Sequence, residues 1–166
     1  MRWLIGFLLL VVLAFVGLRL YLSRDVENRV EPGEEADFAR LQFAHRENVY
    51  LVCPSEPAFC NQPADAQSPI FRMDVGRLRS VLLQALSTEP RLRLASEDEA
   101  RHRLVFIQRS LLLRFPDVIT VELIPLEGER STLAILSRSR YGRKDFGVNS
   151  ARVKRWMANL QAVAGS

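Results

Sequence analysis

An uncharged apolar segment at the N-terminus limits the folds open to this chain more than any other feature. No charged residue occurs from Trp3 up to Arg19, and apolar residues continue to Leu22. A helix rises about 1.5 Å per residue, so this segment reaches the roughly 30 Å that a bilayer's hydrocarbon core requires. Trp3 and Tyr21 would then lie at interfacial depth, and Arg19 could extend towards the headgroups. The sequence therefore predicts a membrane-spanning helix.

A cleaved signal peptide is the main alternative to a retained anchor. A signal peptide has a shorter apolar stretch and small residues at its cleavage site. The distal end here reads Val16-Gly17-Leu18-Arg19-Leu20-Tyr21, which contains no suitable pair of small residues, and no cysteine follows closely as in a lipoprotein. These features favour a retained anchor over a cleaved signal, with a buried core helix as the third alternative.

The direction in which the anchor is inserted is read from the charges around it. Arg19, Arg24 and Arg29 follow the apolar segment, whereas only Arg2 precedes it, and the positive-inside rule taken literally favours a cytoplasmic domain. The very short N-terminal tail is typical instead of a signal anchor whose downstream domain is translocated. We expect a single-pass protein of the inner cell membrane whose domain faces the periplasm or another extracytoplasmic space.

The two cysteines, Cys53 and Cys60, lie in one proline-bearing loop. Two prolines fold this loop back, so a disulfide is the simple interpretation in an oxidising compartment. Free thiols and a metal or redox role are the alternatives. No metal site is expected, because His45 and His102 are the only histidines and both are distant in sequence from the loop. No cofactor is expected either.

Charge and length define the domain organisation. With 166 residues, the chain fits one domain and an appendage. We expect an anchor at 1–22, an acidic tether at 23–48 and a folded domain at 49–166. The net charge is +4, but the basic excess is confined to Arg138–Arg155. A nucleic-acid partner is therefore not favoured, although basic surfaces attract polyanions generally.

Hydrophobic periodicity predicts an α+β domain. Asp74 is a good N-cap for a helix that ends before Pro90, and Asn149 is expected to cap a second helix. Between them we expect an antiparallel meander of four strands, with both helices packed on one face of the sheet. The predicted strands lie around Leu92–Leu94, Leu104–Ile107, Val118–Ile124 and Leu133–Leu136, with a turn at Glu127–Arg130.

The C-terminal third carries a recognisable pattern. Ser139–Asn149 reads S-R-Y-G-R-K-D-F-G-V-N and is followed by Arg152-Val153. This resembles the signature of the DUF1499 family, a pattern like S-R-x-G-x-x-D-x-G-V-N-x-x-R-V. Phe115-Pro116-Asp117 resembles the family's F-x-D segment, and Cys53–Cys60 resembles its C-P-x-S-P-N-C loop. The resemblance covers roughly 49–160. It implies a fold and a setting, but no mechanism, because the family has no established activity.

The same segment is a candidate anion or ligand site, since a helix N-terminus beside several cations suits a phosphate or carboxylate. The candidate residues are Arg138, Ser139, Arg140, Arg143, Lys144, Asp145, Asn149 and Arg152. The alternative is structural: the glycines permit unusual backbone angles, Asp145 bonds loop amides or pairs with Arg140, and Asn149 caps the helix.

We therefore expect a membrane-tethered extracytoplasmic domain that binds an anionic group, an envelope lipid or a partner protein, without catalysis. The alternative is an envelope hydrolase working through Asp117, Asp145 and Arg140. Paired catalytic carboxylates lie roughly 5–9 Å apart, whereas aspartates held separately in loop hydrogen bonds would exclude this mechanism.

The predicted topology is tested by reporter fusions at the C-terminus. One reporter is an enzyme that is active only outside the cytoplasm. We expect this fusion to be active, because the short N-terminal tail directs the domain across the membrane. A cytoplasmic reporter at the same position serves as the control and is expected to be inactive. Activity of the cytoplasmic reporter alone would place the domain inside the cell.

Overall fold

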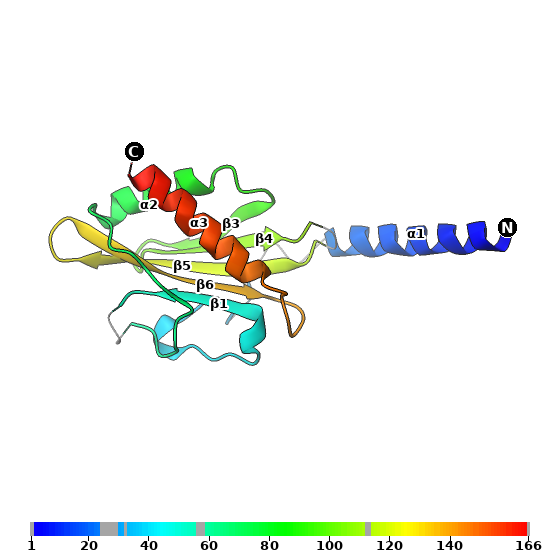
Figure 1. Cartoon of the computed structure of the whole chain (residues 1–166), viewed down its shortest axis with the longest axis horizontal. Helices are drawn as coiled ribbons and strands as arrows, with labels where there is room; N and C mark the ends of the chain where they lie inside the picture. Colours follow the sequence, from blue (N-terminus) through cyan, green and yellow to red (C-terminus); the bar gives the residue numbers. More distant parts are fainter. Residues whose placement is uncertain (1, 24–29, 32, 56–58, 112–113, 166) are drawn as a thin grey trace.

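The computed structural model describes residues 2–23, 30–31, 33–55, 59–111 and 114–165. The N-terminal helix α1 (Arg2–Ser23) projects from one end of a folded domain (Figure 1). The span Trp3–Tyr21 is exposed along its length and is long and apolar enough to cross a bilayer. A helix of this kind is either a membrane anchor or a signal sequence.

The domain is built on one mixed sheet with the strand order β2-β1-β6-β5-β4-β3. The strands are β1 (Val49–Cys53), β2 (Ala66–Gln67), β3 (Leu92–Asp98), β4 (Arg103–Arg109), β5 (Pro116–Leu126) and β6 (Arg130–Ser139). β3 to β6 form the predicted antiparallel meander, and the turn between β5 and β6 lies where it was expected.

The predicted number of four strands is wrong, because the sheet has six. β1 pairs antiparallel with β6, and the two-residue strand β2 pairs parallel with β1. β1 is covered on both faces: Val52 packs on the helical side, and Leu51 and Cys53 pack on the other side. β1 has only five residues and runs directly into the proline-bearing cysteine loop, and the two residues of β2 are too few to carry a pattern.

Helices α2 (Val75–Leu86) and α3 (Val148–Ala164) cover one face of the sheet, as predicted (Figure 1). Asp74 caps α2 as expected, since its carboxylate accepts a hydrogen bond of 2.9 Å from the N–H of Arg77. Trp156 of α3 is buried against Phe106 of β4 in an edge-to-face contact, with 5.7 Å between the ring centroids. Burial of these side chains holds the helices on the sheet.

The opposite face of the sheet is covered by the chain that precedes it. Two short 3-10 helices, η2 (Phe38–Arg40) and η3 (Arg46–Asn48), lie in this segment. Phe38 and Leu41 are buried against Leu51 and Leu136 in a second apolar cluster. The later part of the acidic segment therefore packs on the sheet, and its apolar side chains contribute to the core.

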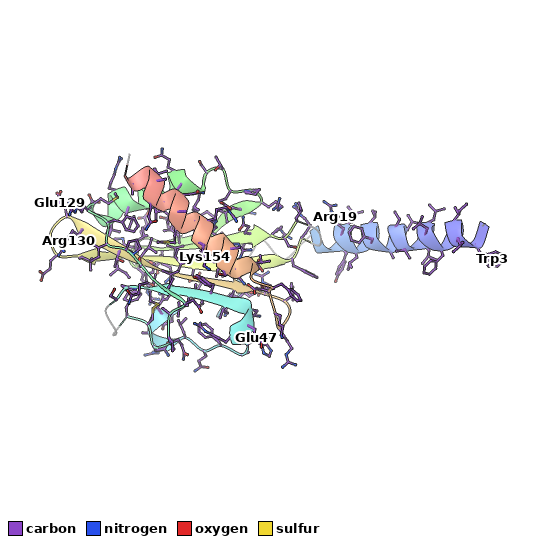
Figure 2. The ribbon with its side chains drawn as sticks, in the orientation of Figure 1. Trp3, Arg19, Glu47, Glu129, Arg130 and Lys154 are labelled. Atoms are coloured by element: carbon purple, nitrogen blue, oxygen red, sulfur yellow. A yellow bond between two sulfur atoms is a disulfide. The ribbon has the colours of Figure 1, made fainter. Side chains whose placement is uncertain are left out.

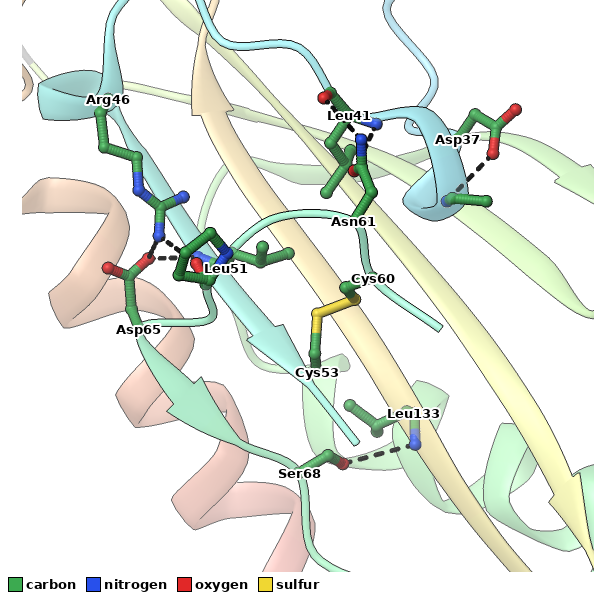
Figure 3. Close-up of a disulfide and its surroundings, with 12 residues drawn as sticks. Asp37, Leu41, Arg46, Leu51, Cys53, Cys60, Asn61, Asp65, Ser68 and Leu133 are labelled. Atoms are coloured by element: carbon green, nitrogen blue, oxygen red, sulfur yellow. Dashed lines mark hydrogen bonds and ion pairs between the residues drawn. A yellow bond between two sulfur atoms is a disulfide. The ribbon is translucent and has the colours of Figure 1, made fainter. Parts of the chain in front are cut away.

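A disulfide joins Cys53 at the end of β1 to Cys60 in the following loop (Figure 3), and their Cα atoms are 6.4 Å apart. The next residue, Asn61, fixes the loop to the covering segment. Its side-chain oxygen accepts a 2.8 Å hydrogen bond from the N–H of Leu41, and its side-chain nitrogen donates to the carbonyl of Leu41. The disulfide and the side-chain amide of Asn61 thus fix the loop and the covering segment around the second apolar cluster.

Removing the disulfide is expected to destabilise the domain by about 2–3 kcal/mol, because it closes a short loop in the unfolded chain. Denaturant unfolding of the full chain in detergent, with and without dithiothreitol, measures this difference. A variant with both Cys53→Ala and Cys60→Ala is the control and should be insensitive to the reductant. Equal stability of the oxidised and reduced chains would show that the cross-link contributes nothing.

Candidate functional site

Arg152 on α3 lies at the centre of a buried polar network. Its guanidinium donates hydrogen bonds to the carboxylate of Asp117 on β5 and to the side-chain oxygen of Gln108 on β4. It also donates to the hydroxyl of Ser137 on β6 at 2.9 Å and to the side-chain oxygen of Asn149 at 2.5 Å. One guanidinium therefore connects the start of α3 to three neighbouring strands.

The charges in this network compensate one another. Arg152 and Asp117 are almost completely buried and form an ion pair. A buried guanidinium is tolerated only when its charge is paired and its N–H groups have partners. Both conditions are met here, so the Arg152 guanidinium is occupied by the protein's own groups.

Asn149 belongs to the same network and does not cap α3, so the predicted cap is wrong. The N-cap is Gly147, whose φ of +82° favours glycine. The capping carboxylate is that of Asp145, which accepts hydrogen bonds from the N–H groups of Gly147 at 2.9 Å and Asn149 at 2.7 Å. Asn149 is already inside the helix, and its amide points inward, where it donates to the carbonyl of Asn48 at 2.9 Å.

The N-terminus of α3 is thus occupied by Asp145. The N–H groups of Gly147 and Asn149, which would bind an anion there, are engaged by this carboxylate. The N–H of Val148 donates to the backbone carbonyl of Asp145. The helix end therefore has a structural role, and the two candidate residues Asp145 and Asn149 are turned towards the protein itself.

A cleft of about 320 Å³ lies beside this network, at the end of β6. Three candidate residues, Arg138, Ser139 and Arg140, line it together. The other lining residues are Glu34, Gln42, Phe43, Ala44, His45, Asn48, Val49 and Gly142. The cleft is therefore lined by two arginines together with the polar residues Ser139, His45 and Asn48.

Glu34, from the acidic segment, places its carboxylate in this cleft. Arg140 donates two hydrogen bonds to it, at 2.6 and 2.5 Å, and both side chains are largely buried. Burial works to lower the pKa of Arg140, but the hydrogen bonds to Glu34 and the charge of its carboxylate outweigh it, so the pKa is raised. This bidentate geometry is the one in which arginine binds carboxylates and phosphates most strongly.

Arg138 lies next to this pair. Its guanidinium donates to the backbone carbonyl of Gly33 at 3.0 Å. Burial lowers the pKa of Arg138, and the positive charge of Arg140 acts in the same direction against the charge of Glu34. Since arginine nevertheless remains protonated in proteins, the residues described as lining the cleft include two cations and the carboxylate of Glu34.

The remaining basic candidates lie on the surface loop between β6 and α3. Lys144 forms an exposed ion pair of 3.4 Å with Glu47, and Arg143 is exposed. Neither residue lines the cleft. The eight candidates are thus divided among the cleft, the buried network, the cap of α3 and the surface.

The three residues of the hydrolase hypothesis have separate sets of partners. Asp117 pairs with Arg152, Asp145 binds backbone amides, and Arg140 pairs with Glu34. Within the described residues, no group of three or more His, Cys, Asp or Glu side chains could hold a metal ion. Several residues of the cleft and the network were not among the eight candidates, including Glu34 and His45 of the cleft and Gln108 of the network. Glu34 could have been found from charge complementarity with the basic segment, and Gln108 from its polarity within an apolar strand.

Comparison with models of known protein families identifies a match. Residues 51–160 match the model of the family DUF1499, described as a protein of unknown function. The match spans more than half of the chain and confirms the resemblance recognised in the signature of the C-terminal third. A search of curated proteins found no match.

Replacing Arg152 with methionine is expected to destabilise the domain by about 3–5 kcal/mol, because Asp117 would keep a buried charge without its partner. Urea unfolding of the full chain in detergent measures this loss. Arg101→Met is the matched control, since Arg101 forms an ion pair of 3.8 Å with Asp98 at the surface. Its loss should cost less than about 1 kcal/mol.

Asp117→Asn combined with Arg152→Met should recover part of the lost stability, since it removes the second charge as well. If Arg152→Met costs no more than Arg101→Met, the network is not the structural centre described above.

Proposed function

This chain belongs to the DUF1499 family, and we propose that it is a membrane-tethered domain that binds an anionic group without catalysis. The ligand group is a phosphate or carboxylate, and its site is the cleft formed by Arg138, Ser139 and Arg140 with His45 and Asn48. The helix α1 serves as the retained anchor in the inner membrane. The domain lies on the extracytoplasmic side, where a disulfide such as Cys53–Cys60 persists.

The observation that carries this proposal is the Glu34 carboxylate in the cleft. It comes from a segment distant in sequence and accepts hydrogen bonds from Nε and Nη2 of Arg140. An arginine pair in a partly dehydrated cleft attracts anions more strongly than it would in water. Glu34 therefore acts as an internal occupant, and an external anion would bind beside it at Arg138 or displace it from Arg140.

Two sources could supply such an anion. The cleft follows the anchor closely, because Arg138 and Arg140 hold Gly33 and Glu34, and the ten residues from Ser23 to Gly33 span at most roughly 35 Å. The phosphate of a lipid headgroup is therefore within reach, as is a soluble phosphate or carboxylate. Both share the chemistry that the arginines recognise.

Thermal unfolding of the full chain in neutral detergent, with and without inorganic phosphate, tests the cleft. Phosphate should raise the unfolding temperature, because a ligand that binds only the folded state stabilises it. Glu34→Gln should increase this shift, since it removes the competing carboxylate. Arg138→Gln and Arg140→Gln should reduce it.

Arg130→Gln is the matched control, because Arg130 is exposed in the turn at the opposite end of the sheet (Figure 2). A short-chain phosphatidylglycerol in place of inorganic phosphate distinguishes the two sources: a larger shift with the lipid indicates a headgroup, and equal shifts indicate phosphate alone. Identical shifts for the wild type, Glu34→Gln, Arg140→Gln and Arg130→Gln would exclude the cleft as the site.

A further inference from the structure

Large apolar side chains are exposed together at one end of the domain. Phe146 is 93% exposed, Leu111 68%, Tyr141 49% and Val148 48%. Phe146 also has a φ of +53°, in the left-handed region that bulky residues rarely adopt. The loop thus holds a phenyl ring outward, although burying it would be favourable. Exposed apolar side chains that gather in one place indicate a contact surface.

These residues come from two neighbouring loops and the start of α3. Leu111 lies between β4 and β5, Tyr141 and Phe146 lie between β6 and α3, and Val148 is the first residue of α3. The loops leave the same end of the sheet because Asp117, near the start of β5, pairs with Ser139 at the end of β6. The rings of Phe115 and Tyr141 connect them, with 5.8 Å between centroids.

Positive charge accompanies this surface. Arg143 and Lys144 are exposed in the same loop as Phe146. Among the described residues, Glu47 pairs with Lys144, and the carboxylate of Asp145 is engaged by the amides that begin α3. An apolar surface bordered by arginine and lysine is typical of proteins that lie on anionic lipid.

The anchor emerges at this same end. α1 projects from the end of the sheet at which β6 finishes, while the turn with Glu129 and Arg130 lies at the far end (Figures 1 and 2). The tether is fixed there independently, since Arg138 and Arg140 hold Gly33 and Glu34 at the end of β6. The described residues of the far turn, Glu127–Arg130, include no exposed large apolar side chain; nearby, Ile70 is 59% exposed beside the bridge between Phe71 and Ser131.

We propose that this end of the domain docks on the bilayer that contains α1. Phe146, Tyr141, Val148 and Leu111 enter the interfacial layer, and Arg143 and Lys144 contact lipid phosphates. Because the tether keeps the domain at a high local concentration beside the membrane, a small apolar surface is sufficient. The inference rests on the proposed anchoring by α1, but it does not depend on anion binding in the cleft or on which side of the membrane the domain lies.

The test uses the full chain reconstituted into vesicles of mixed phosphatidylglycerol and phosphatidylcholine. A small apolar, environment-sensitive fluorophore is attached to a cysteine introduced as Phe146→Cys, while the native cysteines stay paired in their disulfide. Quenching by lipids that carry a nitroxide on the acyl chain reports contact with the bilayer. Label at Glu129→Cys, in the far turn, is the matched control, and label at Leu10→Cys reports whether α1 lies in the membrane.

Docking predicts quenching at positions 10 and 146 and several-fold weaker quenching at 129. Arg143→Glu with Lys144→Glu should reduce quenching at 146 only, and vesicles of phosphatidylcholine alone should do the same. Label at Val148→Cys provides a second reporter in the same surface. Since Phe146 is exposed, its replacement should leave the unfolding temperature unchanged.

Other outcomes overturn the proposal in distinguishable ways. Quenching at 10 but not at 146 or 148 would leave the anchor intact and exclude docking. A blue-shifted but unquenched label at 146 would show that protein, such as a second copy of the chain, covers this surface. Absence of quenching at position 10 would exclude the anchor, and docking with it.

Discussion

The buried ion pair between Arg152 and Asp117 is the interaction on which the arrangement of this domain depends. A guanidinium in the interior must have partners for its charge and its N–H groups, and here they come from three strands and one helix. The requirement fixes the start of α3 against the ends of β4, β5 and β6. Asn149 extends the same network to Asn48, which lines the cleft. The position of the cleft therefore follows from the network.

The cleft and the docking surface share one end of the sheet but differ in chemistry. The cleft is polar and contains a carboxylate from the protein's own tether, held by Arg140. The docking surface consists of exposed apolar side chains from two neighbouring loops and the start of α3. Two cations, Arg143 and Lys144, lie on the loop that precedes α3. In the proposed arrangement, the same loop that builds the cleft also brings it close to lipid, so an anionic headgroup would meet both surfaces at once.

Sequence patterns predicted the helices, which have one apolar face, and the strands that contain long apolar runs. The helix capped by Asp74 has this helical period, whereas β4, β5 and β6 are buried on both faces and were recognised as apolar runs bounded by turns. β1 and β2 were missed, because they have only five and two residues and flank the proline-bearing cysteine loop. The cap of α3 was assigned to Asn149 in place of Asp145, because a residue type that suits a cap also suits a buried network.

The sequence by itself determined the apolar N-terminal helix, the family and the chemical character of the basic segment, since each depends on residues close together in the chain. Only the tertiary structure decided which of those cations are available. It buried Arg152 against Asp117, bound Arg140 to Glu34 and left Arg143 exposed. The partners of a charge come from segments far apart in sequence, so its role is decided when folding brings them together.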